Sequence, residues 1–77
     1  GGSGSTRADA VEALTPRQRE VLLLIARGLS NSEIEAELGI TRATCRSHIT
    51  ALLARLGARD RAQLVIAAYE SGLISAR

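Results

Sequence analysis

Hydrophobic residues recur at helical spacing in four segments of this chain. Ile25, for example, lies four residues after Val21 and three after Leu22, and this spacing places all three on one face of an amphipathic helix. No alternation of period two bounded by hairpin turns competes with this pattern. The sequence therefore predicts an all-α fold, a compact four-helix domain.

Capping residues mark the ends of these helices. Thr15 precedes Pro16 and is followed three residues later by Gln18, which is the pattern of a capping box at a helix start. Ser30 and Glu33 repeat the pattern, and so do Asp60 and Gln63, while glycines mark the helix ends. The predicted helices run from Pro16 to Arg27, from the Ser30 cap to Gly39, from Thr41 to Leu56, and from the Asp60 cap to Gly72.

The first residues of the chain differ in composition from the rest. Gly1 to Ser5 are all glycine or serine, which is typical of flexible linkers. We expect residues 1–11 to be a flexible tag or linker and residues 12–77 to form the domain. A chain of 77 residues suits one domain and is too short for the large α/β enzyme folds.

Composition excludes several further classes. With 45% apolar and 23% charged residues the chain is globular, and it carries neither an apolar run of membrane-spanning length nor a signal peptide, so we expect a cytoplasmic protein. The single Cys45 excludes a disulfide framework and a cysteine zinc site, and we expect no metal and no cofactor. One aromatic residue, Tyr69, cannot build the stacking platforms that hold single-stranded nucleic acid.

The second and third predicted helices form a helix-turn-helix unit. Only residues 39–41 separate them, and the turn contains a glycine. At about 100° per residue, one side of the third helix carries apolar side chains that point inward. The opposite side carries small and polar side chains and one long basic side chain. The inward residues are Cys45, Ile49, Leu52 and Leu56, and the outward residues are Ala43, Arg46, Ser47, Thr50 and Ala54.

The outward side suits the major groove of duplex DNA. Small residues let a helix enter the groove, and arginine, serine and threonine bond base edges or phosphates there. All ten basic residues are arginine, and five of them lie between Arg42 and Arg61 against one acid, Asp60. This positive charge favours DNA binding. The alternative is that these arginines form an ordinary solvated helix face.

The last predicted helix has two apolar sides, one more than a small core needs. We expect Leu64, Val65 and Ala68 to face the core and the other side to face a second protomer. Because both sides are equally apolar, the reverse assignment stays open. The patch is too small for a strong dimer, so we expect pairing mainly on DNA. The residues assigned to the dimer interface are Ala62, Ile66 and Tyr69.

Five stretches of the chain together resemble the LuxR-type DNA-binding domain, which also forms the output module of NarL/FixJ response regulators. They are LTPRQREVL at 14–22, GLSNSEI at 28–34, LGIT at 38–41, TCRSHI at 44–49, and the stretch 56–74, which runs from LG at 56–57 through GLI at 72–74. The resemblance implies that the third helix enters the major groove, that the last helix pairs two protomers, and that a receiver or ligand-sensing domain lies upstream.

The resemblance also implies roles for individual residues. Arg46, Ser47 and Thr50 correspond to base-contacting positions. The family positions that lie near phosphates correspond to Asn31, Thr44 and His48 of this chain. We expect Arg42 to contact phosphate with them. The chain departs from the family pattern at Gln18 and Cys45, where the family has Glu and Val, and at Glu35, where it favours Ala. The third departure is the least conservative, because a carboxylate at a helix crossing needs an arginine partner or an exit to solvent.

Three other functions are weighed against DNA regulation. Cys45 and His48 are spaced like a nucleophile and base, but Cys45 is on the inward stripe and no acid is placed to orient the histidine, so we expect no enzyme. Region four of bacterial sigma factors shares the Leu-Thr-Pro-Arg opening but does not need the apolar last helix. A protein-interaction module could use that helix without DNA, and its binding would respond little to salt.

Overall fold

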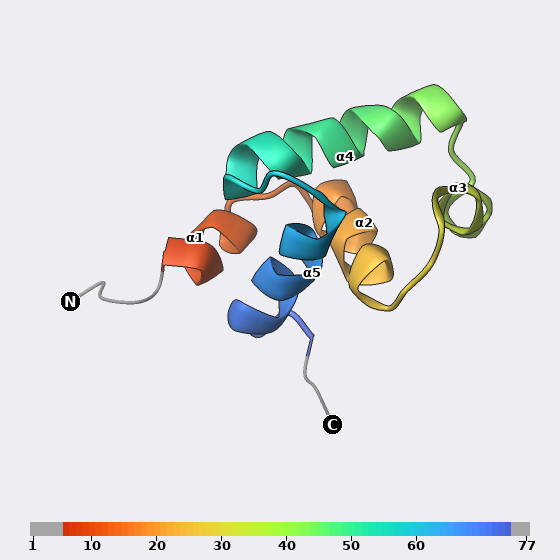
Figure 1. The fold of residues 1–77 in the computed structure, drawn as a ribbon. Coiled ribbons are helices and arrows are strands. Elements are labelled where there is room, and N and C mark those ends of the chain that lie inside the picture. The colour runs from red at the N-terminus through yellow and green to blue at the C-terminus, as the bar shows by residue number, and fades with distance from the viewer. Residues whose placement is uncertain (1–5, 75–77) are drawn as a thin grey trace.

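The computed structural model describes residues 6–74, which form five helices and no strand (Figure 1). The all-α fold is confirmed, and each of the four predicted helices is present with ends within two residues of those expected. No helix in this part of the chain is long and apolar enough to cross a bilayer. The helices are α1 (Thr6–Glu12), α2 (Pro16–Ala26), α3 (Asn31–Leu38), α4 (Arg42–Leu56) and α5 (Arg61–Glu70).

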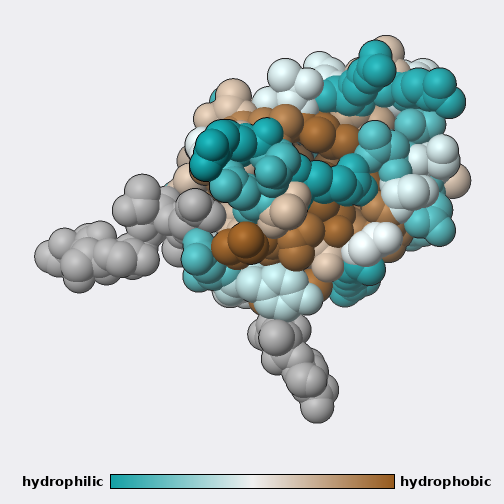
Figure 2. Space-filling model, in the orientation of Figure 1, coloured by the Kyte–Doolittle hydropathy of each residue, from teal (hydrophilic) through white to brown (hydrophobic). Residues whose placement is uncertain are grey.

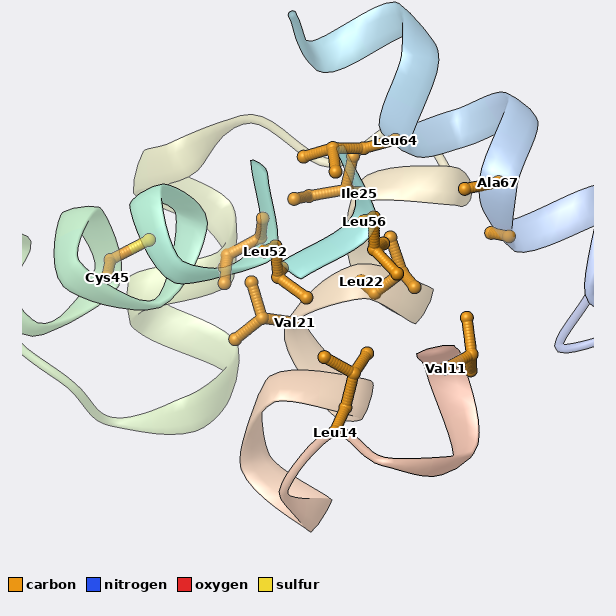
Figure 3. Close-up of a cluster of buried hydrophobic side chains, with 12 residues drawn as sticks. Val11, Leu14, Val21, Leu22, Ile25, Cys45, Leu52, Leu56, Leu64 and Ala67 are labelled. Carbon is orange, nitrogen blue, oxygen red and sulfur yellow. The ribbon is translucent and has the colours of Figure 1, made fainter. Parts of the chain in front are cut away.

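Helix α2 lies at the centre of the fold. It contacts α3, α4 and α5, and its Val21 and Leu22 have no exposed surface. Figure 3 shows Leu52 of α4 beside Val21, and Leu64 of α5 beside Ile25 of α2. Each helix thus contributes its apolar stripe to one shared core, and burial of these side chains is the main stabilising contribution that the fold offers.

The start of the ordered fold differs from the sequence prediction. Residues 6–11 were expected to belong to a flexible linker, but they form most of α1, and Val11 is only 5% exposed in the core with Leu14. Arg19 of α2 donates hydrogen bonds from Nη2 to the carbonyls of Glu12 and Leu14, at 3.2 Å each. A seven-residue helix is not stable alone, so these tertiary contacts hold α1 in place. Residues 1–5 lie outside the described part.

Local hydrogen bonds set the helix starts. Ser30 and Glu33 form the predicted capping box, with the Glu33 N–H donating to Ser30 Oγ at 3.2 Å and the Ser30 N–H donating to Glu33 Oε1 at 2.7 Å. The predicted box at Thr15 and Gln18 is also complete. The box predicted at Asp60 is only half formed, because the Gln63 side chain accepts from the Arg59 N–H instead. The N–H groups of Arg59 and Gln63 each have a side-chain acceptor in this arrangement.

Candidate nucleic-acid interface

The turn between α3 and α4 is closed by hydrogen bonds on both sides. Gly39 adopts a left-handed conformation with φ of 65°, which glycine reaches without the Cβ clash of other residues, and the Ile40 N–H donates to the Glu35 carbonyl at 3.1 Å. Thr41 then caps α4 by accepting from the Thr44 N–H at 3.1 Å. These bonds fix the direction in which α4 leaves α3, and they form the helix-turn-helix unit that the sequence predicts.

Helix α4 separates its side chains into the two predicted faces. Cys45 and Leu52 are 1% and 0% exposed, Leu56 is buried at the end of the helix, and Ile49 is partly buried against the core. The opposite face is open to solvent along the whole helix, with exposed side chains at Ala43, Arg46, Ser47, Thr50 and Ala54. Among the described residues, none of these five makes a side-chain hydrogen bond within the protein. Arg46, Ser47 and Thr50 are therefore available to an external partner.

A hollow lies between α3 and the first turns of α4. It brings Asn31, Arg42 and Arg46 together, three of the residues that the sequence analysis singled out. Hydrophilic residues gather in the upper right of Figure 2, where Figure 1 places α3 and the start of α4. The full lining consists of Asn31, Ser32, Glu35, Arg42, Cys45 and Arg46. Two guanidinium groups with amide and hydroxyl donors beside them form a surface suited to phosphate oxygens.

The remaining predicted contact residues lie outside this hollow. Ser47 and Thr50 continue the exposed face of α4, whereas His48 is half-buried at its side. Thr44 is exposed, but its hydroxyl accepts a hydrogen bond from the Thr41 hydroxyl at 3.0 Å. Its own hydroxyl hydrogen is free to point outward. Of the predicted site residues, the hollow thus brings Asn31, Arg42 and Arg46 together, and the others lie along α4 outside it.

Glu35 was expected from the sequence to have either an arginine partner or an exit to solvent. Glu35 is half-buried and faces the hollow, which gives its carboxylate an exit to solvent. No salt bridge within residues 9–74 joins it to an arginine. Its carboxylate nevertheless acts on its neighbours. Burial raises the pKa of the Cys45 thiol, Glu35 raises it further, and Arg61 opposes the shift. The thiol is therefore held neutral at physiological pH.

The geometry around Cys45 does not suit nucleophilic catalysis. The reactive form of cysteine is the thiolate, and here burial and a neighbouring carboxylate both disfavour it. Cys45 is also 1% exposed, which denies it contact with a substrate. Within the described residues, no group of three or more histidine, cysteine or acidic side chains is arranged to hold a metal ion.

Arg61 binds one residue of the hollow, Asn31, although the sequence analysis assigned it no contact. From the start of α5, its Nη1 donates to Asn31 Oδ1 and its Nη2 donates to the Leu29 carbonyl, each at 2.5 Å. One signal was available in the sequence. A positive charge in the first turn of a helix opposes the helix dipole, so an arginine directly after the Asp60 cap indicates a role outside its own helix.

Helix α5 exposes the side that the sequence assigned to a partner. Ile66 is 50% and Tyr69 is 40% exposed, and Ala62 is exposed beside them. Leu64 and Ala68 are buried and Val65 is partly buried, as expected, and Ala67 is buried with them although it was not predicted. Apolar surface is visible in the middle of Figure 2, over α5. The buried and the exposed side of α5 are therefore those that the sequence predicts, whereas pairing of two protomers stays a prediction.

Comparison with known proteins assigns this architecture to a family. Residues 12–68 match the family described as bacterial regulatory proteins, luxR family. The chain is 46% identical over 68 residues to the response regulator protein VraR of Staphylococcus aureus strain Mu3, and equally similar to the proteins of that name from S. saprophyticus and S. epidermidis. The match covers 88% of this chain and 32% of each relative. The chain therefore belongs to the luxR family of bacterial regulatory proteins.

Proposed function

We propose that this chain is the DNA-binding output domain of a bacterial transcriptional regulator. The observation that carries the proposal is the outer face of α4, which is exposed, small and polar and begins beside a hollow with two arginines. Its residues Arg46, Ser47 and Thr50 make no side-chain hydrogen bond to the described part of the protein. A helix of this kind fits the major groove, where arginine bonds guanine in a bidentate manner. In this role α4 is the recognition helix, and the protein is a regulator and not an enzyme.

The roles within this surface follow from position and chemistry. Arg46, Ser47 and Thr50 read base edges because they share the exposed face of α4. Asn31 and Arg42 contact phosphates from the rim of the hollow, with Thr44 and His48 nearby on α4. Phosphate contacts set the register of the helix, and base contacts supply the selectivity. The match to the luxR family extends into α5, which favours this function over a sigma-factor region.

Pairing through α5 and control by an upstream domain are further parts of the proposal. The exposed Ile66 and Tyr69 offer an apolar contact that is too small for a stable dimer in free solution. Two adjacent half-sites on DNA raise the effective concentration of the protomers and allow this contact to form. The chain spans about a third of the length of relatives named response regulators. A receiver domain upstream and a cytoplasmic location are consistent with that name.

The decisive experiment removes the arginine from the recognition face. A binding site is first selected from random duplexes with the wild-type domain, and Arg46→Ala is then titrated against it. We expect binding to weaken by about 1–3 kcal/mol and the preference at one base pair to relax, because one bidentate contact is lost. Gel-shift titrations on the selected duplex and its single-base variants measure both effects.

Arg55→Ala is the matched control. Arg55 is an exposed arginine on the same helix, nine residues and half a turn away from Arg46, so the variant loses the same charge from another side. It should keep the base preference of the wild type. If Arg46→Ala kept the affinity and selectivity of the wild type, or if both variants lost selectivity equally, Arg46 would not be a base-reading residue.

A further inference from the structure

Arg61 links α5, the helix predicted to pair two protomers, with the helix-turn-helix unit. Its guanidinium reaches from the first residue of α5 to the start of α3, thirty residues earlier in the chain. One nitrogen donates to Asn31 Oδ1 and the other to the Leu29 carbonyl, which lies just before the cap of α3. Arg61 is also close enough to Cys45 to lower the pKa of that thiol. The guanidinium thus contacts Asn31, one of the residues that line the hollow.

This contact determines which way the Asn31 amide points. A guanidinium has only donors, so the atom of Asn31 that faces it must be the amide oxygen. The amide nitrogen, with two hydrogens to donate, is left without a hydrogen bond to any described residue. Asn31 is exposed and lines the hollow together with Arg42 and Arg46. Its amide NH2 group is therefore available to an external acceptor, such as water or a phosphate oxygen.

We propose that Arg61 is a positioning residue for DNA binding, which holds the Asn31 amide with its N–H groups directed at a backbone phosphate. The inference rests on the proposed function, since it requires that DNA lies against the hollow. Arg61 makes no phosphate contact of its own in this role. Without it, the Asn31 side chain rotates freely, and the ordering of that side chain must then occur on binding.

A double-mutant cycle on DNA affinity tests the inference. The variants are Arg61→Met, which keeps the length of the side chain but has no donor, Asn31→Ala, and the two combined. We expect each single variant to weaken binding to the selected duplex about tenfold, as for one lost hydrogen bond to phosphate. The double variant should also lose about tenfold, because both substitutions remove the same contact. A loss near a hundredfold in the double variant would overturn the inference, and so would unchanged affinity in Arg61→Met.

The salt dependence separates positioning from direct contact. If Arg61 neutralised a phosphate itself, Arg61→Met would lower the slope of log K against log salt by about 0.9. Positioning through the neutral Asn31 amide predicts a change far smaller than that. The folded fraction of each free variant is checked by circular dichroism at the assay temperature. Should Arg61→Met be unfolded there, the wild type and all three variants are compared at a lower temperature at which each of them is folded.

The wild-type protein and Arg46→Ala are titrated in the same series. Failure of the wild type to bind any selected duplex would overturn the proposed function and the inference with it. Wild-type binding that depends on Arg46, combined with additive losses at Arg61 and Asn31, would leave the proposed function standing and overturn the positioning role alone.

Discussion

Cys45 is the one thiol of the chain, and it lies on the inner stripe of α4. Because it is 1% exposed and burial raises its pKa, it should react slowly with maleimide or disulfide reagents in the native protein. Cys45→Val should keep DNA binding, since valine fills a similar apolar volume. Thiol labelling of the native and urea-unfolded protein measures the protection, and rapid native labelling would contradict a structural role.

The same residue makes stability depend on pH in a defined direction. The pKa of Cys45 is raised in the folded state, so its neutral form stabilises the fold fully below the ordinary thiol pKa of 9.0. This contribution is lost as the pH rises toward the folded-state pKa, because the unfolded chain releases the proton first. Denaturant unfolding should therefore show a steeper loss of stability above about pH 9 for the wild type than for Cys45→Val. Parallel pH profiles would argue against this coupling.

At the scale of single elements, the end of α3 depends on Gly39. Its φ is +65°, and a Cβ built there would meet no atom within 4 Å, so the only penalty of a side chain is backbone strain. We expect Gly39→Ala to destabilise the fold by about 1 kcal/mol and Gly39→Asn by less, because asparagine tolerates the left-handed region. Thermal and urea unfolding measure the change.

Gly57, at the end of α4, is the natural comparison for Gly39. Its φ is +63° and its Cβ position is also open, so Gly57→Ala should have a similar effect. If Gly39→Ala matched the wild type while Gly57→Ala was destabilised, the end of α3 would not depend on the left-handed cap.

Helix boundaries could be predicted from the sequence because the interactions that set them are local. Thr15, Ser30 and Thr41 each bond a backbone N–H three residues away, so their effect is visible in a short window of sequence. Helix α1 was missed because its stability depends on burying Val11 and on bonds from Arg19, seven residues after the end of the helix. A short polar window gives no sign of such partners.

The candidate site, too, could be predicted where it depends on local sequence and not where it depends on tertiary packing. The outward face of α4 follows from helical periodicity alone, and its five residues are exposed as expected. The contact from Arg61 to Asn31 was not foreseen, because it joins residues thirty positions apart through a route that only the packing of α5 against the fold creates. The position of Glu35 beside the hollow likewise depends on how α3 crosses α4.

At the scale of the whole molecule, the pairing of two copies through α5 is a prediction that one substitution tests. Ile66→Glu places a charge in the exposed apolar side of α5 and should abolish cooperative loading of two protomers on a duplex with two half-sites, while a single half-site is still bound. Analytical ultracentrifugation of the free protein and of its DNA complexes measures this. The free wild-type domain should be mostly monomeric.

Ala13→Glu is the control for pairing, because it adds the same charge at an exposed position outside α5. It should load two protomers as the wild type does. If Ile66→Glu stays folded and loads two protomers with undiminished cooperativity, another surface forms the dimer.

The five outward residues of α4 also bear on how such a domain evolves. Ala43, Arg46, Ser47, Thr50 and Ala54 are exposed and make no side-chain hydrogen bonds to described parts of the protein, while the caps and core that orient the helix involve other residues. Substitutions at exposed positions of this kind change stability by only about 0.5 kcal/mol. The face proposed to read DNA is thus made of other residues than those that stabilise the fold. If it reads DNA as proposed, a lineage carrying this fold can acquire a new operator by a few substitutions on one helix face, without first gaining stability elsewhere.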